Sequence, residues 1–156
     1  MTYVFDTSSF IVLGHYFPER FPSFWDRFEQ AVSEGKIVSV REVLRELETE
    51  AAKPHLQEWI GRNKRVFLTP SQAETEFVAQ IFGVHHFQHM IEQKRRLKGG
   101  PAADPFVIAA ARVRGGYVVT EETDKPNAAR IPNVCRHFDI RRTNLEGFMK
   151  MESWRF

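Results

Sequence analysis

Hydrophobic and polar positions change in short blocks along the chain, and these blocks predict strands that alternate with helices. Four short runs rich in β-branched and aromatic residues are typical of buried strands: residues 2–5, 36–39, 65–69 and 117–120. Between these runs, apolar residues recur three or four positions apart. Phe24, Phe28 and Val32 share one face of a helix expected over 22–35. Other helices are expected over about 8–15, 39–51, 84–97 and 104–114, after Thr69-Pro70, and after residues 143–146.

Two of these helices carry recognisable start signals. Ser39 and Glu42 are spaced as a capping box, in which each side chain accepts a hydrogen bond from the backbone N–H of the other residue. Thr69 and Gln72 repeat the spacing around Pro70, which suits the first turn of a helix.

Short apolar strands separated by helices favour a parallel sheet that is covered by helices on both faces. We therefore expect an α/β, three-layer fold with a central, mostly parallel sheet of four to five strands flanked by helices. The length of 156 residues suits a single domain over residues 1–156. In such sheets, ligands bind outside the carboxyl ends of the strands.

The composition is that of a globular protein, with 42% hydrophobic and 27% charged residues. Cys135 is the only cysteine, so no intrachain disulfide can form. No apolar run is long enough to cross a bilayer, and we expect a cytoplasmic protein without membrane attachment. The net charge is only +2, but Lys94, Arg95, Arg96 and Lys98 form a basic cluster that permits binding to a phosphate backbone.

Acidic residues lie near the ends of several predicted strands. Asp6 ends the first strand, and Glu46 lies on the helix after the second. Glu121 and Glu122 follow the fourth strand, and Asp104 begins the helix that leads into it. Carboxylates that converge at one edge repel one another unless a cation neutralises them. Oxygen ligands without His or Cys favour Mg²⁺ or Mn²⁺, which can activate water and stabilise charge on a phosphodiester.

Most of these acids also have a structural explanation. Asp104 is well placed to cap its helix, and Glu42 is accounted for by the capping box. Glu46 lies where an exposed acid on a helix is common. Asp6 is the hardest to explain structurally, because the hydroxyl residues after it can already cap the next helix.

Three stretches resemble the motifs of the PIN-domain nucleases and occur in that family's order. "YVFDTSSFI" resembles the first motif, a strand that ends in Asp with Ser or Thr close behind. "VSVREVLRELE" is similar to the second motif, and "ADPFVIAAARVRGGYVVTEE" resembles the third and fourth. "VVTEE" followed by "IPNVC" resembles the subgroup that contains the VapC toxins.

The resemblance implies a PIN-like fold and a ribonuclease that uses Mg²⁺ or Mn²⁺ to hydrolyse RNA phosphodiester bonds. It also implies a small antitoxin protein as a partner, and it allows a homodimer. The implied catalytic and metal-binding acids are Asp6, Glu46, Asp104 and Glu122. The expected substrate-binding residues are Ser8, Thr120, Lys94, Arg95, Arg96 and Lys98.

The fourth acid departs from the family's pattern. The family usually has Thr, any residue and then Asp, whereas here the residue two positions after Thr120 is Glu122. Glutamate is longer by one methylene, and Glu121 is a second candidate. Either the site keeps three close acids with a distant fourth, or its activity is reduced.

Other chemistries fit the sequence less well. A phosphoacceptor receiver domain needs an Asp after the third strand, where this chain has "FLTP", and haloacid-dehalogenase-type phosphotransfer needs a second Asp where "DTS" has none. His85 and His89 are four residues apart, but no HExxH pattern or third zinc ligand accompanies them. Two alternatives stay open: a non-catalytic PIN-like module that binds RNA or protein, and a housekeeping PIN nuclease.

Overall fold

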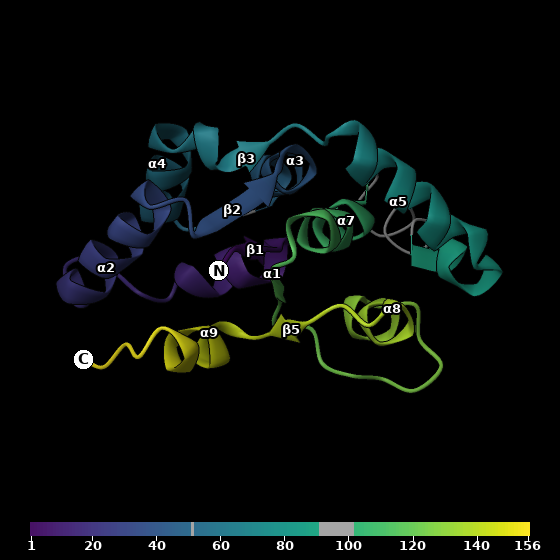
Figure 1. The fold of residues 1–156 in the computed structure, drawn as a ribbon. Coiled ribbons are helices and arrows are strands. Elements are labelled where there is room, and N and C mark those ends of the chain that lie inside the picture. Colours follow the sequence, from purple (N-terminus) through teal and green to yellow (C-terminus); the bar gives the residue numbers. More distant parts are fainter. Residues whose placement is uncertain (51, 91–101) are drawn as a thin grey trace.

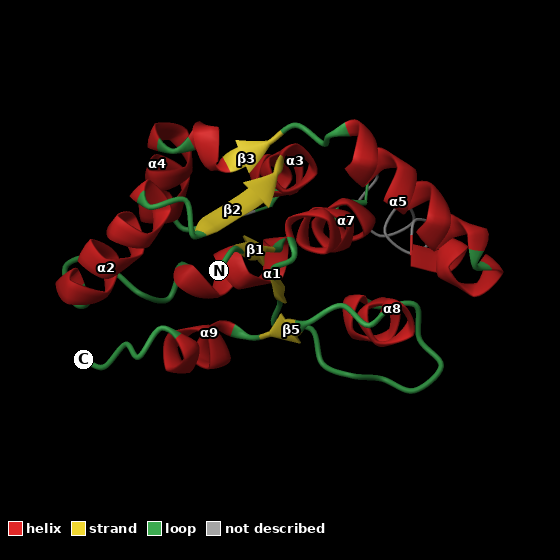
Figure 2. Cartoon of the chain, in the orientation of Figure 1, coloured by secondary structure: helices red, strands yellow, loops and turns green. Residues whose placement is uncertain are grey.

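The computed structural model describes residues 1–50, 52–90 and 102–156 (Figure 1; Figure 2 colours the same view by type of element). The strands are β1 (Tyr3–Phe5), β2 (Ile37–Val40), β3 (Phe67–Leu68), β4 (Tyr117–Val119) and β5 (Arg142–Thr143). The α-helices are α1 (Thr7–Leu13), α2 (Pro22–Ser33), α3 (Arg41–Thr49), α4 (Pro54–Arg62), α5 (Gln72–Gly83), α7 (Asp104–Arg114), α8 (Ile131–Phe138) and α9 (Leu145–Met151). The 3₁₀ helices of the described part are η1 (Lys64–Val66) and η2 (His85–Gln88).

The strands form one sheet in the order β3-β2-β1-β4-β5, and all hydrogen-bonded neighbours run parallel. β1 is central, and its Tyr3 aligns with Ile37 of β2 on one side and with Tyr117 of β4 on the other. The chain builds the sheet outward from β1 in one direction and then, from β4 onward, in the other. The carboxyl ends of β1 and β4 therefore form the topological switch point, where ligands bind in sheets of this kind.

Helices lie on both sides of the sheet, which confirms the predicted α/β class with a parallel sheet of five strands. Figure 1 shows α2, α4 and α9 on one side of the strands and α5, α7 and α8 on the other. Tyr3 and Phe5 share one face of β1 and pack on Phe148 of α9, with ring centroids 4.7 Å and 5.4 Å away. Phe5 also packs on Phe10 of α1 and Phe28 of α2. Helix α7 packs against β1, β2 and β4 and contacts both α5 and α8.

The capping box predicted for Ser39 and Glu42 is wrong. Ser39 belongs to β2, and its hydroxyl donates a hydrogen bond to the carbonyl oxygen of Phe5 at 2.6 Å. Helix α3 begins two residues later, after Val40, which makes no side-chain capping bond. Because β2 pairs with β1, the Ser39 hydroxyl is bound to β1 and does not cap α3. Glu42 therefore has no partner for the capping box that the sequence predicted.

Two other helix starts also differ from expectation. Helix α5 is capped by Ser71 in a box with Glu74, rather than by Thr69 with Gln72, because the Ser71 hydroxyl accepts the Glu74 N–H at 3.2 Å. Asp104 is the first residue of α7 rather than its N-cap. The N-cap position is Ala103, whose carbonyl oxygen accepts the N–H of Val107 at 3.0 Å.

Helices α4 and α8 have no counterpart among the predicted elements. Each has a proline at its first or second position. The helix expected over 84–97 begins instead as the 3₁₀ helix η2, and residues 91–97 lie outside the described residues.

Candidate active site

Asp6 lies at the switch point of the sheet, directly after β1. Its backbone N–H donates to the carbonyl oxygen of Val119 at 3.0 Å, and the Thr120 hydroxyl donates to Asp6 Oδ2 at 2.5 Å. The carboxylate also accepts the Ser8 hydroxyl and both the N–H and the hydroxyl of Ser9, at 2.8–2.9 Å. The bond from the Ser9 N–H makes Asp6 itself the N-cap of α1, so the expected cap by the following hydroxyl residues is wrong.

The Asp6 carboxylate is almost completely removed from water, with only 2% of the residue exposed. This desolvation raises the pKa of Asp6 above the usual range of an aspartate. The hydrogen bonds from Thr120, Ser9 and Ser8 act in the opposite direction, because they stabilise the charged form. A cation beside Asp6 would add to this stabilisation.

Glu46 connects the segments that carry the two aspartates. The hydroxyl of Thr7 donates to Glu46 Oε1 at 2.9 Å, and the backbone N–H of Ala103 donates to Oε2 at 3.1 Å. Thr7 follows Asp6 in the chain and Ala103 precedes Asp104, so one carboxylate spans the starts of α1 and α7. Asp104 and Glu46 are both buried, at 5% and 7% exposure. The structure therefore places Asp6, Glu46 and Asp104 at the same end of the sheet.

Ser8 and Thr120 lie against Asp6, with their hydroxyl oxygens 3.4 Å apart. Ser8 Oγ accepts the backbone N–H of Glu121 at 3.0 Å, and Thr120 Oγ1 accepts that of Glu122 at 3.1 Å. The loop after β4 is thus fixed to the two hydroxyls that hold the Asp6 carboxylate.

The side chains of Glu121 and Glu122 turn toward the starts of two helices. Glu122 Oε2 accepts the N–H of Ile131 at the start of α8 at 3.0 Å, and Glu121 Oε1 accepts the N–H of Leu145 at the start of α9 at 2.9 Å. Negative charge is favourable at these positions, because helix N-termini carry unpaired N–H groups and partial positive charge. Both glutamates therefore have a structural role at the edge of the site.

Glu42 is a buried acid of α3 that the sequence assigned to a cap. Its side chain is 4% exposed, and its Oε2 lies 3.2 Å from Nε of Arg41, a side chain that is 43% exposed. Its other oxygen, Oε1, is buried without a hydrogen-bond partner among the described residues. An unsatisfied buried carboxylate oxygen is rare and calls for an explanation.

The donor atoms at this end of the sheet fit a hard divalent cation in their chemistry. They are carboxylate and hydroxyl oxygens, which suit Mg²⁺ or Mn²⁺ better than Zn²⁺. Within residues 1–50, 52–90 and 102–156, no three Asp, Glu, His or Cys side chains are arranged to hold a metal ion as they stand, and this covers His85, His86 and His89. Mg²⁺ often binds through only one or two carboxylates, with water and substrate phosphates as its other ligands. The described residues fit a site of that kind.

The basic residues expected to bind substrate, Lys94, Arg95, Arg96 and Lys98, lie outside the described residues. In the part of the chain that is described, no helix combines the length and the apolar character needed to cross a membrane.

A family described as "Domain of unknown function (DUF4411)" matches residues 3–156. The chain belongs to this family. Among solved structures, the fold is similar to a chain of the crystal structure of VapBC2 from Rickettsia felis bound to a DNA fragment from their promoter. The likeness has a TM-score of 0.51 and 14% sequence identity, and it covers 92% of this chain and 98% of the other. No curated protein matches the chain. At this identity the likeness shows the fold, which agrees with the one that the PIN-domain resemblance implies.

Proposed function

We propose that this DUF4411 protein is a Mg²⁺- or Mn²⁺-dependent ribonuclease that hydrolyses RNA phosphodiester bonds. The observation that carries the proposal is the placement of three buried acids, Asp6, Glu46 and Asp104, at the carboxyl end of the sheet beside its switch point. Buried like charges at one edge raise the free energy of the fold unless a cation compensates them. A divalent cation that also binds a phosphate would compensate these charges. Acids with a purely structural role would have no reason to gather at this edge.

In this proposal Asp6 and Asp104 hold the cation, with Glu46 beside them and Glu122 or Glu121 at the margin. A cation bound there would supply positive charge for the phosphodiester and a water of lowered pKa. Ser8 and Thr120 hold the Asp6 carboxylate in its charged, ligating form and lie where they can donate to substrate oxygens once a cation takes their place on Asp6.

The proposal includes a role as the toxin of a toxin-antitoxin pair. Its support is the similarity of the fold to a chain of the VapBC2 complex, together with the order of the motifs in the sequence. The partners would then be RNA, reached through Lys94, Arg95, Arg96 and Lys98, and a small antitoxin that covers the acidic edge with a basic side chain.

RNA cleavage by the purified protein with Mn²⁺ or Mg²⁺ tests the activity. The Asp6→Asn and Asp104→Asn variants should fold and lose cleavage, because each removes a charged ligand while keeping the shape of the side chain. Asp124→Asn is the matched control. Asp124 lies on the loop after β4, is exposed and pairs with Arg136 of α8, so cleavage should stay at the wild-type rate. Unchanged cleavage in both site variants would assign these acids to structure, and absent cleavage in the wild type would favour the non-catalytic module.

Expression of the chain without a partner tests the toxin role. The wild type should slow growth, and Asp6→Asn should restore it. If wild-type expression is harmless while the purified protein cleaves RNA, a housekeeping PIN nuclease becomes the better assignment.

A further inference from the structure

Glu42 has a buried carboxylate oxygen whose lack of a partner has no structural explanation. Arg41 approaches only Oε2, and because its side chain is 43% exposed, solvent weakens its interaction with the acid. Leaving a buried charged oxygen without a hydrogen bond costs more free energy than a typical hydrogen bond contributes. The unpartnered oxygen of Glu42 therefore destabilises the fold, unless a ligand binds to it.

The register of the sheet places Glu42 at the same end as Asp6. Val4 of β1 aligns with Val38 of β2, and two residues further along each strand Asp6 is level with Val40. Neighbouring strands are about 4.8 Å apart, so the first turn of α3 begins beside the Asp6 backbone. Glu42 lies in that first turn.

The periodicity of α3 puts Glu42 on the same buried face as Glu46. Residues four apart share one face of a helix, so Glu42 and Glu46 project the same way. The Glu46 carboxylate contacts Thr7 and Ala103, the chain neighbours of Asp6 and Asp104. The buried face of α3 therefore looks onto the two aspartates, with Glu42 at the end nearest the strands.

Resting on the proposed function, we infer that Glu42 is the acid of α3 that binds the divalent cation, through its unpartnered oxygen, and that Glu46 is a positioning residue. Both Glu46 oxygens accept hydrogen bonds from the protein, which join α1, α3 and α7 around the site. Glu42 instead has an oxygen available in a buried place. Glu42 together with one of the two aspartates, water and a substrate phosphate is a ligand set of the kind that Mg²⁺ often takes.

Two measurements together test this assignment. One is direct Mn²⁺ binding, followed by electron paramagnetic resonance of the free ion, and the other is the melting temperature without metal. Glu42→Gln should weaken Mn²⁺ binding by roughly tenfold or more, as the loss of a close electrostatic partner of a metal does. Without metal it should melt at or above the wild-type temperature, because a buried carboxylate with one unpartnered oxygen is replaced by a neutral group. Glu46→Gln should instead lower the melting temperature without metal, because an amide has one accepting oxygen for two donors.

Two further variants sharpen the test. Glu48→Gln changes an exposed acid of the same helix and should alter neither quantity. Glu42→Asp keeps the charge on a shorter side chain, so its Mn²⁺ affinity should lie between those of the wild type and Glu42→Gln.

The outcomes separate this inference from the proposed function. If the wild type binds Mn²⁺ and Glu42→Gln binds it with the same affinity, Glu42 is not a ligand, and the nuclease proposal still stands. The unpartnered oxygen of Glu42 would then be bound to a water molecule. An absence of Mn²⁺ binding in the wild type would overturn the metal-dependent function and this assignment with it.

Discussion

The Asp6 carboxylate shows how a single buried charge is held in this fold. Burial removes the water around this carboxylate. Hydrogen bonds from the hydroxyls of Ser8, Ser9 and Thr120 and from one backbone N–H replace those to water. Hydrogen bonds to a charged group are worth more than those between neutral groups. Thr120 is the donor that comes from the other half of the sheet, so it also ties β4 to β1.

Thr120→Val tests the weight of that donor with little change of shape. The substitution removes the 2.5 Å bond to Asp6 and the acceptor of the Glu122 N–H. We expect the free energy of unfolding to fall by about 1–3 kcal/mol, measured by urea denaturation at neutral pH. The same substitution in an Asp6→Asn background should cost less, because a neutral amide needs the donor less than a buried carboxylate does. Equal costs in the two backgrounds would mean that the bond to Asp6 contributes nothing and that Thr120 acts through packing and through its bond from the Glu122 N–H.

The positions of residues in the fold were predictable where the signal is local and missed where they depend on contacts between distant segments. The positions of Asp6 and Asp104 were predictable because one directly follows an apolar strand and the other begins a helix. The connection of Glu46 to Thr7 and Ala103 links residues far apart in sequence, so no local pattern contains it. Glu42 was misassigned because Ser39 resembles a cap, whereas its hydroxyl is bound to the neighbouring strand.

At the scale of elements, the four apolar strand runs and most of the amphipathic helices were predictable, whereas β5, α4 and α8 were not. The third strand, predicted over 65–69, is present as the two residues of β3, whereas β5, also of two residues, was missed and exists as a strand only through its pairing with β4. Helix α8 is also short, and its defining contact, the bond from Ile131 to Glu122, comes from another segment. The carboxyl edge of the sheet could thus be predicted in outline, together with α9 at its margin, but α8 could not.

The turn between α7 and β4 offers a test of how closely elements approach. A Cβ atom added at Gly116 would lie 2.2 Å from the carbonyl oxygen of Thr2, which also accepts the N–H of Tyr117 at 2.9 Å. This neighbour is backbone at the start of β1 and cannot move without disturbing the central strand. Gly116→Ala should therefore lower the free energy of unfolding by about 1–3 kcal/mol, as overpacking does.

Gly61 in α4 supplies the matched control for that substitution. An added Cβ there has no heavy atom within 4 Å, and alanine favours a helix interior over glycine by up to about 1 kcal/mol. Gly61→Ala should leave the stability unchanged or raise it slightly. A Gly116→Ala variant as stable as Gly61→Ala would show that the α7–β4 turn can relax.

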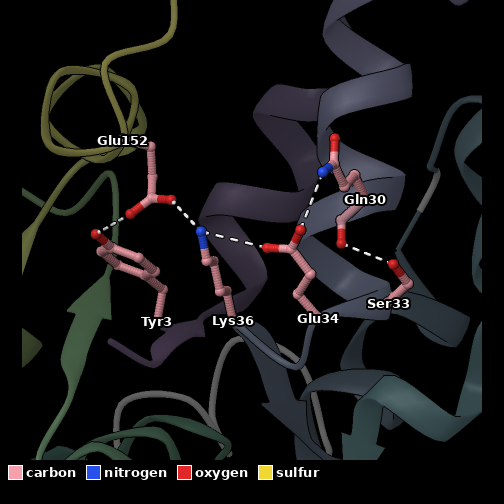
Figure 3. A network of polar contacts seen from close by, with 6 residues as sticks. All are labelled: Tyr3, Gln30, Ser33, Glu34, Lys36 and Glu152. Atoms are coloured by element: carbon pink, nitrogen blue, oxygen red, sulfur yellow. Dashed lines mark hydrogen bonds and ion pairs between the residues drawn. The ribbon is translucent and has the colours of Figure 1, made fainter.

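At the scale of the whole molecule, the end of the sheet opposite Asp6 is closed by a polar network that joins the two ends of the chain (Figure 3). The Tyr3 hydroxyl donates to Glu152 Oε2 at 2.8 Å, and Lys36 Nζ lies 3.2 Å from Glu152 Oε1 and 3.3 Å from Glu34. Desolvation and the nearby Glu152 raise the pKa of Tyr3 above its usual range, so its hydroxyl stays protonated and donates. Trp154 adds ring contacts to Phe148 and Phe24. The chain thus attaches its last residues at one end of the sheet and places Asp6, Glu46 and Asp104 at the other.

This separation predicts that the network can be weakened without loss of cation binding. Glu152→Ala leaves the hydroxyl of Tyr3, a residue that is 2% exposed, without its acceptor, so the free energy of unfolding should fall by about 1–3 kcal/mol. In a Tyr3→Phe background, which removes the donor, the same change should cost less, and the difference measures the coupling between the two ends of the chain. Mn²⁺ affinity, measured well below the melting temperature, should equal that of the wild type in all three variants. A loss of Mn²⁺ binding in folded Glu152→Ala would show that the two ends of the sheet are coupled and that the acidic edge depends on the C-terminal attachment.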